Sequence, residues 1–267
     1  MATQPAPQLP VFYKNLIPLS TSEHAGYSTR GSDTADYLVG QHAVPITADE
    51  FIHGQRSFPI VFSTGENPVP LALTGLNEGV NVFVDEEGKA LNPFYVPAYV
   101  RRYPYVLARF QPDSNELSLC FDAESGLVGD FDEGEPLFAD GKPTEQLNNI
   151  LKFCEDFETA IQRTQAFVSE LKTLDLLIDG EVSIQPADST QPFVYRGFQM
   201  VAEEKLRDMN GDQLRKLNQN GMLTLIMAHL FSLTQITDLF GRQMQQGKVP
   251  TAADAAAAPA ADAPADA

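Results

Sequence analysis

The stretch PTEQLNNILKFCEDFETAIQRTQAFVSELKTL, residues 143–174, decides the fold. Its apolar residues recur at steps of three, four and seven, at positions 147, 150, 151, 154, 157, 161, 168, 171 and 174. This spacing places them on one face of a helix. Pro143 and Thr144 precede the helix, and Glu145 lies in its first turn, where a carboxylate is favourable. The stretch therefore predicts one long amphipathic helix with a buried apolar face.

Before this helix the sequence is typical of strands and turns. Short apolar runs bounded by Pro, Gly and polar residues predict strands over residues 42–46, 58–62, 70–73, 80–84, 104–110 and 116–122. A short helix is expected over residues 48–54, because Thr47 and Glu50 have the spacing of a capping box.

After the long helix, two strands are expected over residues 181–184 and 193–201, and a helix over residues 212–219. A last helix is expected from residue 222 to about residue 240. Its first part, MLTLIMAHLFSL, is too short for a bilayer span and fits a buried core helix. The fold class is therefore α+β: a mostly antiparallel sheet in the N-terminal half, packed with the long amphipathic helix and the buried C-terminal helix.

Composition limits the function classes. The chain has 267 residues, with 36 acidic against 18 basic side chains and a formal charge of −18. This charge disfavours nonspecific nucleic-acid binding and adhesion to anionic lipid. Cys120 and Cys154 lie among apolar residues, which is typical of free thiols in a reducing compartment. The N-terminus has no basic region followed by an apolar stretch, so we expect a cytoplasmic protein, with export by a route without a signal peptide as the open alternative.

The domain organisation that we expect is simple. Residues 1–10 form a flexible segment, and residues 11–247 form one α+β domain. Residues 248–267, which after Thr251 consist of Ala, Pro and Asp only, form a disordered tail.

Motifs for known chemistry are missing from the sequence. It contains no dinucleotide-binding or P-loop glycine motif, no G-x-S-x-G and no H-E-x-x-H. We therefore assign no catalytic residue, cofactor or metal ligand. His24, His42 and His53 lie within thirty residues of one another and could converge on a metal, although their spacing does not enforce this. His229 lies among Leu, Met and Phe and is expected to be a hydrogen-bonded core histidine.

The candidate binding residues lie in NPFYVPAYVRRYPYVLARF, residues 92–110. They are Tyr95, Tyr99, Arg101, Arg102 and Tyr103. The tyrosines could stack on a ligand while one guanidinium forms paired hydrogen bonds with a carboxylate or phosphate. In an extended conformation the two arginines would point to opposite faces, so only one would serve a given site. In the alternative interpretation, the arginines pair with carboxylates of this chain and the aromatic rings belong to the core.

The same segment carries a family resemblance. YVPAYVRRYP at residues 95–104, with FPIVF at residues 58–62, resembles the SapC family of bacterial proteins. GEPLF at residues 134–138 and the AHL triplet around His229 fit the same pattern. The resemblance covers about residues 10–240 and makes residues 11–247 a SapC-like domain. It implies an association with surface-layer biogenesis or export and brings no catalytic residues.

These observations favour a non-enzymatic accessory or binding protein in surface-layer or outer-membrane-associated pathways. Its partner would be a protein or a small molecule, with no nucleic acid and no membrane span. The alternative is an enzyme that modifies a peptide or small metabolite, and one version of it depends on a metal held by His24, His42 or His53. A third hypothesis, a structural subunit, predicts self-assembly into sheets.

Overall fold

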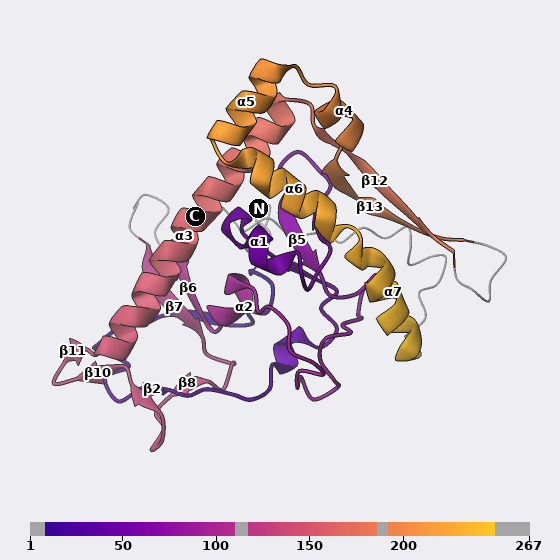
Figure 1. Cartoon of the computed structure of the whole chain (residues 1–267). Helices are drawn as coiled ribbons and strands as arrows, with labels where there is room; N and C mark the ends of the chain where they lie inside the picture. Colours follow the sequence, from indigo (N-terminus) through magenta and orange to yellow (C-terminus); the bar gives the residue numbers. More distant parts are fainter. Residues whose placement is uncertain (1–8, 110–116, 186–191, 249–267) are drawn as a thin grey trace, which may run out of the picture. The chain divides into compact units, whose positions relative to one another are not determined.

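The computed structural model describes residues 9–109, 117–185 and 192–248 (Figure 1). The predicted flexible segment over residues 1–10 and the predicted tail over residues 248–267 lie outside this range, except for residues 9, 10 and 248. The chain divides into two compact units. Among the described residues, unit 1 comprises those up to Asp33 together with Tyr99–Thr159, and unit 2 comprises Thr34–Ala98 and those from Ala160 to residue 248.

Unit 1 contains a three-stranded antiparallel sheet in the order β1, β7, β6. These strands are β1 (Leu16–Pro18), β6 (Tyr105–Ala108) and β7 (Ser118–Asp122). Five strands of two residues each pair in two smaller sheets: β2 (Ser28–Thr29), β8 (Val128–Gly129), β9 (Glu135–Pro136), β10 (Phe138–Ala139) and β11 (Lys142–Pro143). Leu147 and Cys154 from the first half of α3 (Glu145–Thr173) pack against Tyr105 and Phe121 to form the core of this unit.

Unit 2 contains a five-stranded antiparallel sheet in the order β12, β13, β4, β5, β3. The strands are β3 (Ala43–Pro45), β4 (Ile60–Phe62), β5 (Pro70–Leu73), β12 (Leu177–Ile184) and β13 (Phe193–Val201). Every residue of β4 and β5 is buried, so side chains cover both faces of these two strands. The hydrophobic core of unit 2 also includes Phe167, Val168 and Leu171 from the second half of α3.

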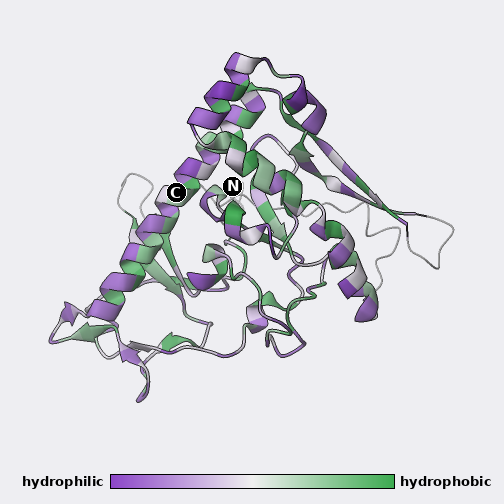
Figure 2. Ribbon diagram, viewed as in Figure 1, coloured by the Kyte–Doolittle hydropathy of each residue, from purple (hydrophilic) through white to green (hydrophobic). Residues whose placement is uncertain are grey.

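Unit 2 also contains several shorter helices, most of which Figure 1 labels. They are η1 (Asp36–Leu38), η2 (Ala48–Glu50), α1 (Phe51–Gly54), α4 (Glu203–Arg207), α5 (Gly211–Gln219), α6 (Met222–Ser232) and α7 (Gln235–Gln245). Helix α6 contacts β4 and β13. Figure 2 shows hydrophobic residues along most of α6 and a mixture of hydrophilic and hydrophobic residues along α3.

The β12–β13 hairpin is irregular at one point. Its register shifts between Gly180 and Glu181, where Gly197 is the additional residue of β13 and has a φ of 88°. Gly180 lies opposite Phe198, and a Cβ at Gly180 would lie 2.1 Å from a carbon of the Phe198 ring. Both positions therefore require glycine, Gly197 for its left-handed backbone and Gly180 for the close approach of the ring.

The structure confirms the α+β class, the long helix and the capping box of Thr47 and Glu50. The predicted strand over residues 80–84 is wrong. These residues form a buried loop with one isolated bridge, Val84 to Ala90. The Asn81 side chain accepts from Phe83 N at 2.8 Å and donates to Leu38 O at 3.0 Å. The two bonds of Asn81, together with isolated backbone bonds such as Val82 N to Thr74 O at 2.9 Å, take the place of a strand ladder in this loop.

The predicted single helix from residue 222 to about 240 is also wrong, because it breaks into α6 and α7. In the turn between them, Leu233 N and Thr234 N bond to carbonyls three residues back. The Thr234 hydroxyl also donates to Phe231 O at 2.7 Å. These contacts tighten the turn and end α6.

Within the described residues, one stretch, Met222–Gln245, is long and apolar enough to cross a membrane by length and composition alone. The core helix of a soluble protein meets the same criteria.

Candidate functional site

The five predicted binding residues fall into both units. Tyr95 belongs to unit 2, whereas Tyr99, Arg101, Arg102 and Tyr103 belong to unit 1. The segment is not extended: Ala98–Arg101 form the short helix α2, and a turn connects it to β6. Successive helical residues point about 100° apart. Arg101 is exposed and Arg102 is buried, so the two arginines have different roles.

Aromatic rings enclose the guanidinium of Arg102. Its central carbon lies 4.5 Å from the ring centre of Tyr99, 4.4 Å from that of Phe157 and 5.8 Å from that of Tyr13. Nη1 lies 3.6 Å from Oε1 of Glu158, and the Arg102 side chain is 3% exposed. Electron-rich ring faces and one carboxylate compensate a buried cation in this arrangement. Arg102 therefore holds unit 1 together, as the alternative interpretation of the sequence expected for both arginines.

The tyrosine hydroxyls near Arg102 are also engaged within the chain. Tyr13 donates to Tyr105 O at 2.6 Å, and Tyr99 donates to Val11 O at 3.0 Å. Burial raises the pKa of Tyr13 and of Tyr99, and the nearby Arg102 opposes both shifts. Both phenols therefore stay protonated at neutral pH and serve as hydrogen-bond donors to the backbone.

The buried carboxylate of Asp122 organises the same region. It accepts hydrogen bonds from Lys14 N and Asn15 N, both at 3.0 Å, and from Glu124 N at 3.1 Å. The Tyr103 hydroxyl donates to it at 3.2 Å. Four donors satisfy a fully buried carboxylate and fix the segment before β1 against the end of β7. The local sequence does not signal this role, because Lys14 N and Asn15 N donate from 108 and 107 residues away along the chain.

Arg101 is the arginine of the pair that unit 1 presents to solvent. Its guanidinium carbon lies 5.3 Å from the ring centre of Phe153 on α3, and Phe153 is half-buried. The side chain at the end of α2 thus rests beside an aromatic ring that the helix face also exposes.

Tyr95 is fixed within unit 2. Its hydroxyl donates to Oε1 of Glu50 at 2.9 Å, and its backbone N–H donates to the Ser57 hydroxyl at 3.1 Å. Its ring stacks on His53 at a centroid distance of 6.0 Å. The same Glu50 oxygen accepts from Ala98 N at 2.6 Å. Tyr95 therefore joins the loop before α2 to η2.

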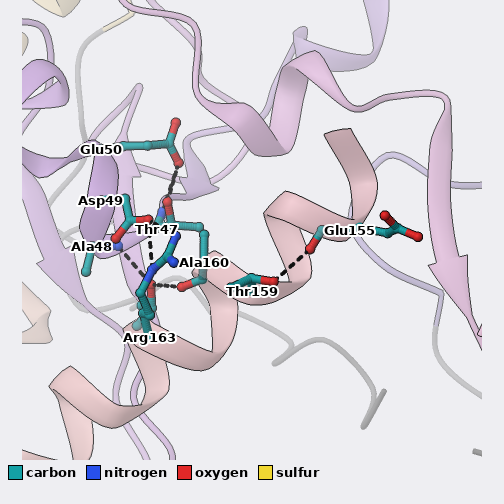
Figure 3. A network of polar contacts seen from close by, with 9 residues as sticks. Thr47, Ala48, Asp49, Glu50, Glu155, Thr159, Ala160 and Arg163 are labelled. Carbon is teal, nitrogen blue, oxygen red and sulfur yellow. Dashed lines mark hydrogen bonds and ion pairs between the residues drawn. The ribbon is translucent and has the colours of Figure 1, made fainter. Parts of the chain in front are cut away.

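Glu50 belongs to a polar network around η2, part of which Figure 3 shows. Its Oε2 accepts from both the backbone N–H and the hydroxyl of Thr47, at 3.0 and 2.9 Å. Ala48 N donates to the Thr164 hydroxyl of α3 at 2.8 Å, and Arg163 pairs with Asp49. The capping-box spacing in the sequence identified Glu50 as a helix-capping residue, but not its bonds to Tyr95 and Ala98.

The histidines do not form a metal site in the described part of the chain, where no group of three His, Cys, Asp or Glu side chains could hold a metal ion. In unit 1, Nδ1 of His24 accepts from Ser20 N at 3.1 Å, and its ring packs on Tyr27 and Phe121. In unit 2, burial lowers the pKa of His42, and His53 stacks on Tyr95.

His229 is the core histidine that the sequence predicts. Its Nε2 accepts from Val201 N at 3.0 Å, so its Nδ1 carries the proton and donates to Ile60 O at 2.8 Å. Burial lowers its pKa to about 4. Three residues on, the Ser232 hydroxyl accepts from Ile60 N at 2.9 Å. Two side chains of α6 thus satisfy both backbone groups of Ile60.

The comparison with protein families shows to which family the chain belongs. The family model named SapC matches residues 19–239 of the 267-residue chain. The chain belongs to the SapC family. No curated protein and no solved structure matches it. The region shared with the SapC family contains all five predicted binding residues and His229. It starts after Tyr13, Lys14 and Asn15, which contact Arg102 and Asp122 in this SapC-family chain.

Proposed function

We propose that this SapC-family protein is a non-enzymatic accessory protein of the cytoplasm. The partner that it binds belongs to a surface-layer or outer-membrane-associated pathway. The observation that carries the proposal is the exposed Arg101 at the end of α2, beside the ring of Phe153. Family membership supports the link to the surface layer.

Arg101 has the properties of an interface residue. The planar guanidinium can contact an aromatic face and donate several hydrogen bonds to a partner at the same time. The part of the helix that carries it is held within unit 1, since Tyr99 bonds to Val11 O. A side chain on a fixed element loses less conformational freedom on binding.

The buried ionisable groups support a binding role over a catalytic one. Arg102 is enclosed by aromatic rings, and Asp122, Glu50 and His229 are bonded to backbone groups of the chain. A catalytic acid or base must lie within hydrogen-bond reach of a substrate. These four groups instead maintain the fold.

An affinity pull-down with identification by mass spectrometry tests the proposal. It compares the wild type with Arg101→Ala and with Arg215→Ala, which removes the same charge from an exposed site on α5. We expect one partner to be retained by the wild type and by Arg215→Ala but lost by Arg101→Ala. Equal recovery of every partner by the two variants would contradict the proposal.

A third variant, Arg101→Lys, separates charge from geometry. Lysine keeps the positive charge but loses the planar group that forms paired hydrogen bonds. Loss of the partner in Arg101→Lys would indicate recognition of a carboxylate or phosphate by paired hydrogen bonds. Retention would indicate a simple electrostatic contact.

A further inference from the structure

The five-stranded sheet of unit 2 has two edge strands of very different length. One edge is β3, which has three residues and ends in Pro45. The other edge is β12, which has eight residues, LIDGEVSI, and contains no proline (Figure 1). Short edge strands and prolines prevent a further strand from pairing with a sheet. The β3 edge has both of these features, and the β12 edge has neither.

The backbone of β12 is engaged on one side. In the part of the chain that the structure describes, β12 forms its ladder with β13 alone. The register shift of this hairpin arises from the additional residue Gly197 of β13, so β12 itself is continuous. Alternate residues of a strand direct their N–H and C=O groups to opposite edges, so half of these groups in β12 point away from β13. A partner that bonds to them along the whole strand must itself be extended.

The side chains of β12 form one apolar and one polar face. Val182 and Ile184 pack against the core of unit 2, whereas Asp179 and Glu181 are exposed. A strand added beside β12 would continue both faces. Its residues on one face would lie beside the half-buried Ile178 and Val182, and those on the other face beside Asp179 and Glu181. The edge therefore fits a segment in which apolar and polar residues alternate.

The acidic residues of β12 oppose pairing with a second copy of this chain. Two antiparallel β12 strands centred on Gly180 would place Asp179 of each copy opposite Glu181 of the other. Residues directly opposite in such a pair have Cβ atoms about 5 Å apart, where like charges are destabilising. The formal charge of −18 on each copy adds to this repulsion.

The same acidic residues favour a basic segment. The two strands of the hairpin carry three charged side chains, Asp179, Glu181 and Arg196. Nε of Arg196 pairs with Oε2 of Glu181 at 2.7 Å, so among these three charges Asp179 is left without a counterion. A Lys or Arg opposite Asp179 on an added strand would supply one. The charge of the whole chain also attracts basic segments at longer range.

We propose that β12 is a docking edge that takes an extended basic segment of a partner protein as a further strand of the unit 2 sheet. The segment alternates basic residues, on the side of Asp179, with apolar residues, on the side of Val182. Main-chain hydrogen bonds supply the affinity, and the alternating side chains supply the selectivity. This inference concerns residues of unit 2 and is independent of the proposed role of Arg101.

Fluorescence anisotropy tests the proposal with the full chain and a labelled peptide in which Lys and Val alternate over about eight residues, at about 150 mM salt. Two further peptides carry N-methyl groups, one on every Lys and the other on every Val. Their charge and composition are equal, but only one of the two methylated rows would face β12. We expect one methylated peptide to bind at least about tenfold more weakly than the other, because it loses the main-chain hydrogen bonds.

A charge substitution and hydrogen exchange locate the contact. Asp179→Lys should weaken binding of the unmethylated peptide by about fivefold. Glu124→Lys, in an exposed turn of unit 1, makes the same change of charge and should leave binding nearly unchanged. Circular dichroism establishes that both variants are folded. In the wild type, the bound peptide should slow hydrogen exchange at the backbone amides of Leu177–Ile184.

Three outcomes would overturn the proposal. They are a Lys–Val peptide that does not bind, equal binding of the two methylated peptides, and protection from exchange only at amides outside β12. Equal binding of the methylated peptides would indicate electrostatic attraction to an acidic protein and no added strand. A wild type that dimerises, and whose β12 amides gain protection as its concentration rises, would assign the edge to a second copy and contradict the basic segment.

Discussion

Nε2 of His229 accepts a hydrogen bond from the backbone N–H of Val201 over 3.0 Å. The β13–β4 pairing is limited to Gln199 opposite Phe62, and two residues further in this register Val201 would lie opposite Ile60. The imidazole lies between these two residues and bridges them, since its other nitrogen donates to Ile60 O. A helix side chain thus replaces a direct bond between two strands.

This bridge predicts a pH-dependent contribution to stability. Burial lowers the pKa of His229 to about 4 in the folded chain, whereas an unfolded histidine has a pKa of about 6.5. The unfolded state therefore binds more protons between these values. The contribution of His229 to the free energy of unfolding is therefore fully present above about pH 6.5. It falls by up to about 3 kcal/mol as the pH decreases toward 4.

Denaturant unfolding of the wild type and of His229→Gln at several pH values measures this contribution. We expect the wild type to be more stable at pH 7.5 and its advantage to shrink by about 2 kcal/mol at pH 5. A difference that stays constant with pH would show that His229 does not titrate in this way.

Gly180 predicts a steric effect in the β12–β13 hairpin. In Gly180→Ala the new methyl group would meet the Phe198 ring, which packs in the core, so we expect a loss of about 1–3 kcal/mol. Gly241→Ala is the control, since Gly241 lies inside α7 with open space where a methyl group would go, and it should gain about 0.5–1 kcal/mol. Thermal unfolding measures both changes, and a neutral Gly180→Ala would contradict the packing of Phe198.

The two cysteines predict slow thiol chemistry. Both are free and buried, and burial raises the pKa of Cys120 to about 11 and that of Cys154 to about 12, with Arg102 opposing the shift at Cys154. The thiolate is the reactive form, so folded protein at pH 8 should react very slowly with iodoacetamide. Mass spectrometry would show two additions after denaturation. Rapid labelling of the folded chain would show that unit 1 opens readily.

The sequence predicted those elements whose signals are local. The stripe of the long helix and the Thr47–Glu50 capping box depend on residues a few positions apart, and both are present in the structure. The two-residue strands such as β8 and β9 are too short to carry an alternating pattern, so they were not predicted. The loop over residues 80–84 is as apolar as a strand, but its hydrogen bonds come from the Asn81 side chain and from isolated backbone pairs and form no strand ladder.

The candidate site shows the same limit. The sequence identified Arg101 and Arg102 as a pair, and it left open whether they bind a partner or carboxylates of the chain. The two arginines differ because Phe157 and Glu158, more than fifty residues away along the chain, lie beside Arg102. Contacts at that distance along the chain leave no trace in the local pattern of residues 92–110.

Arg102 is enclosed within unit 1, whereas the exposed Arg101 is the residue that we propose for recognition. The most direct measurement of this difference is the thermal unfolding of Arg101→Ala and Arg102→Ala beside the wild type. We expect Arg101→Ala to stay within about 0.5 kcal/mol of the wild type. We expect Arg102→Ala to lose about 3 kcal/mol or more, because Glu158 and the aromatic rings lose the cation between them. Equal stability of the two variants would contradict this division of roles.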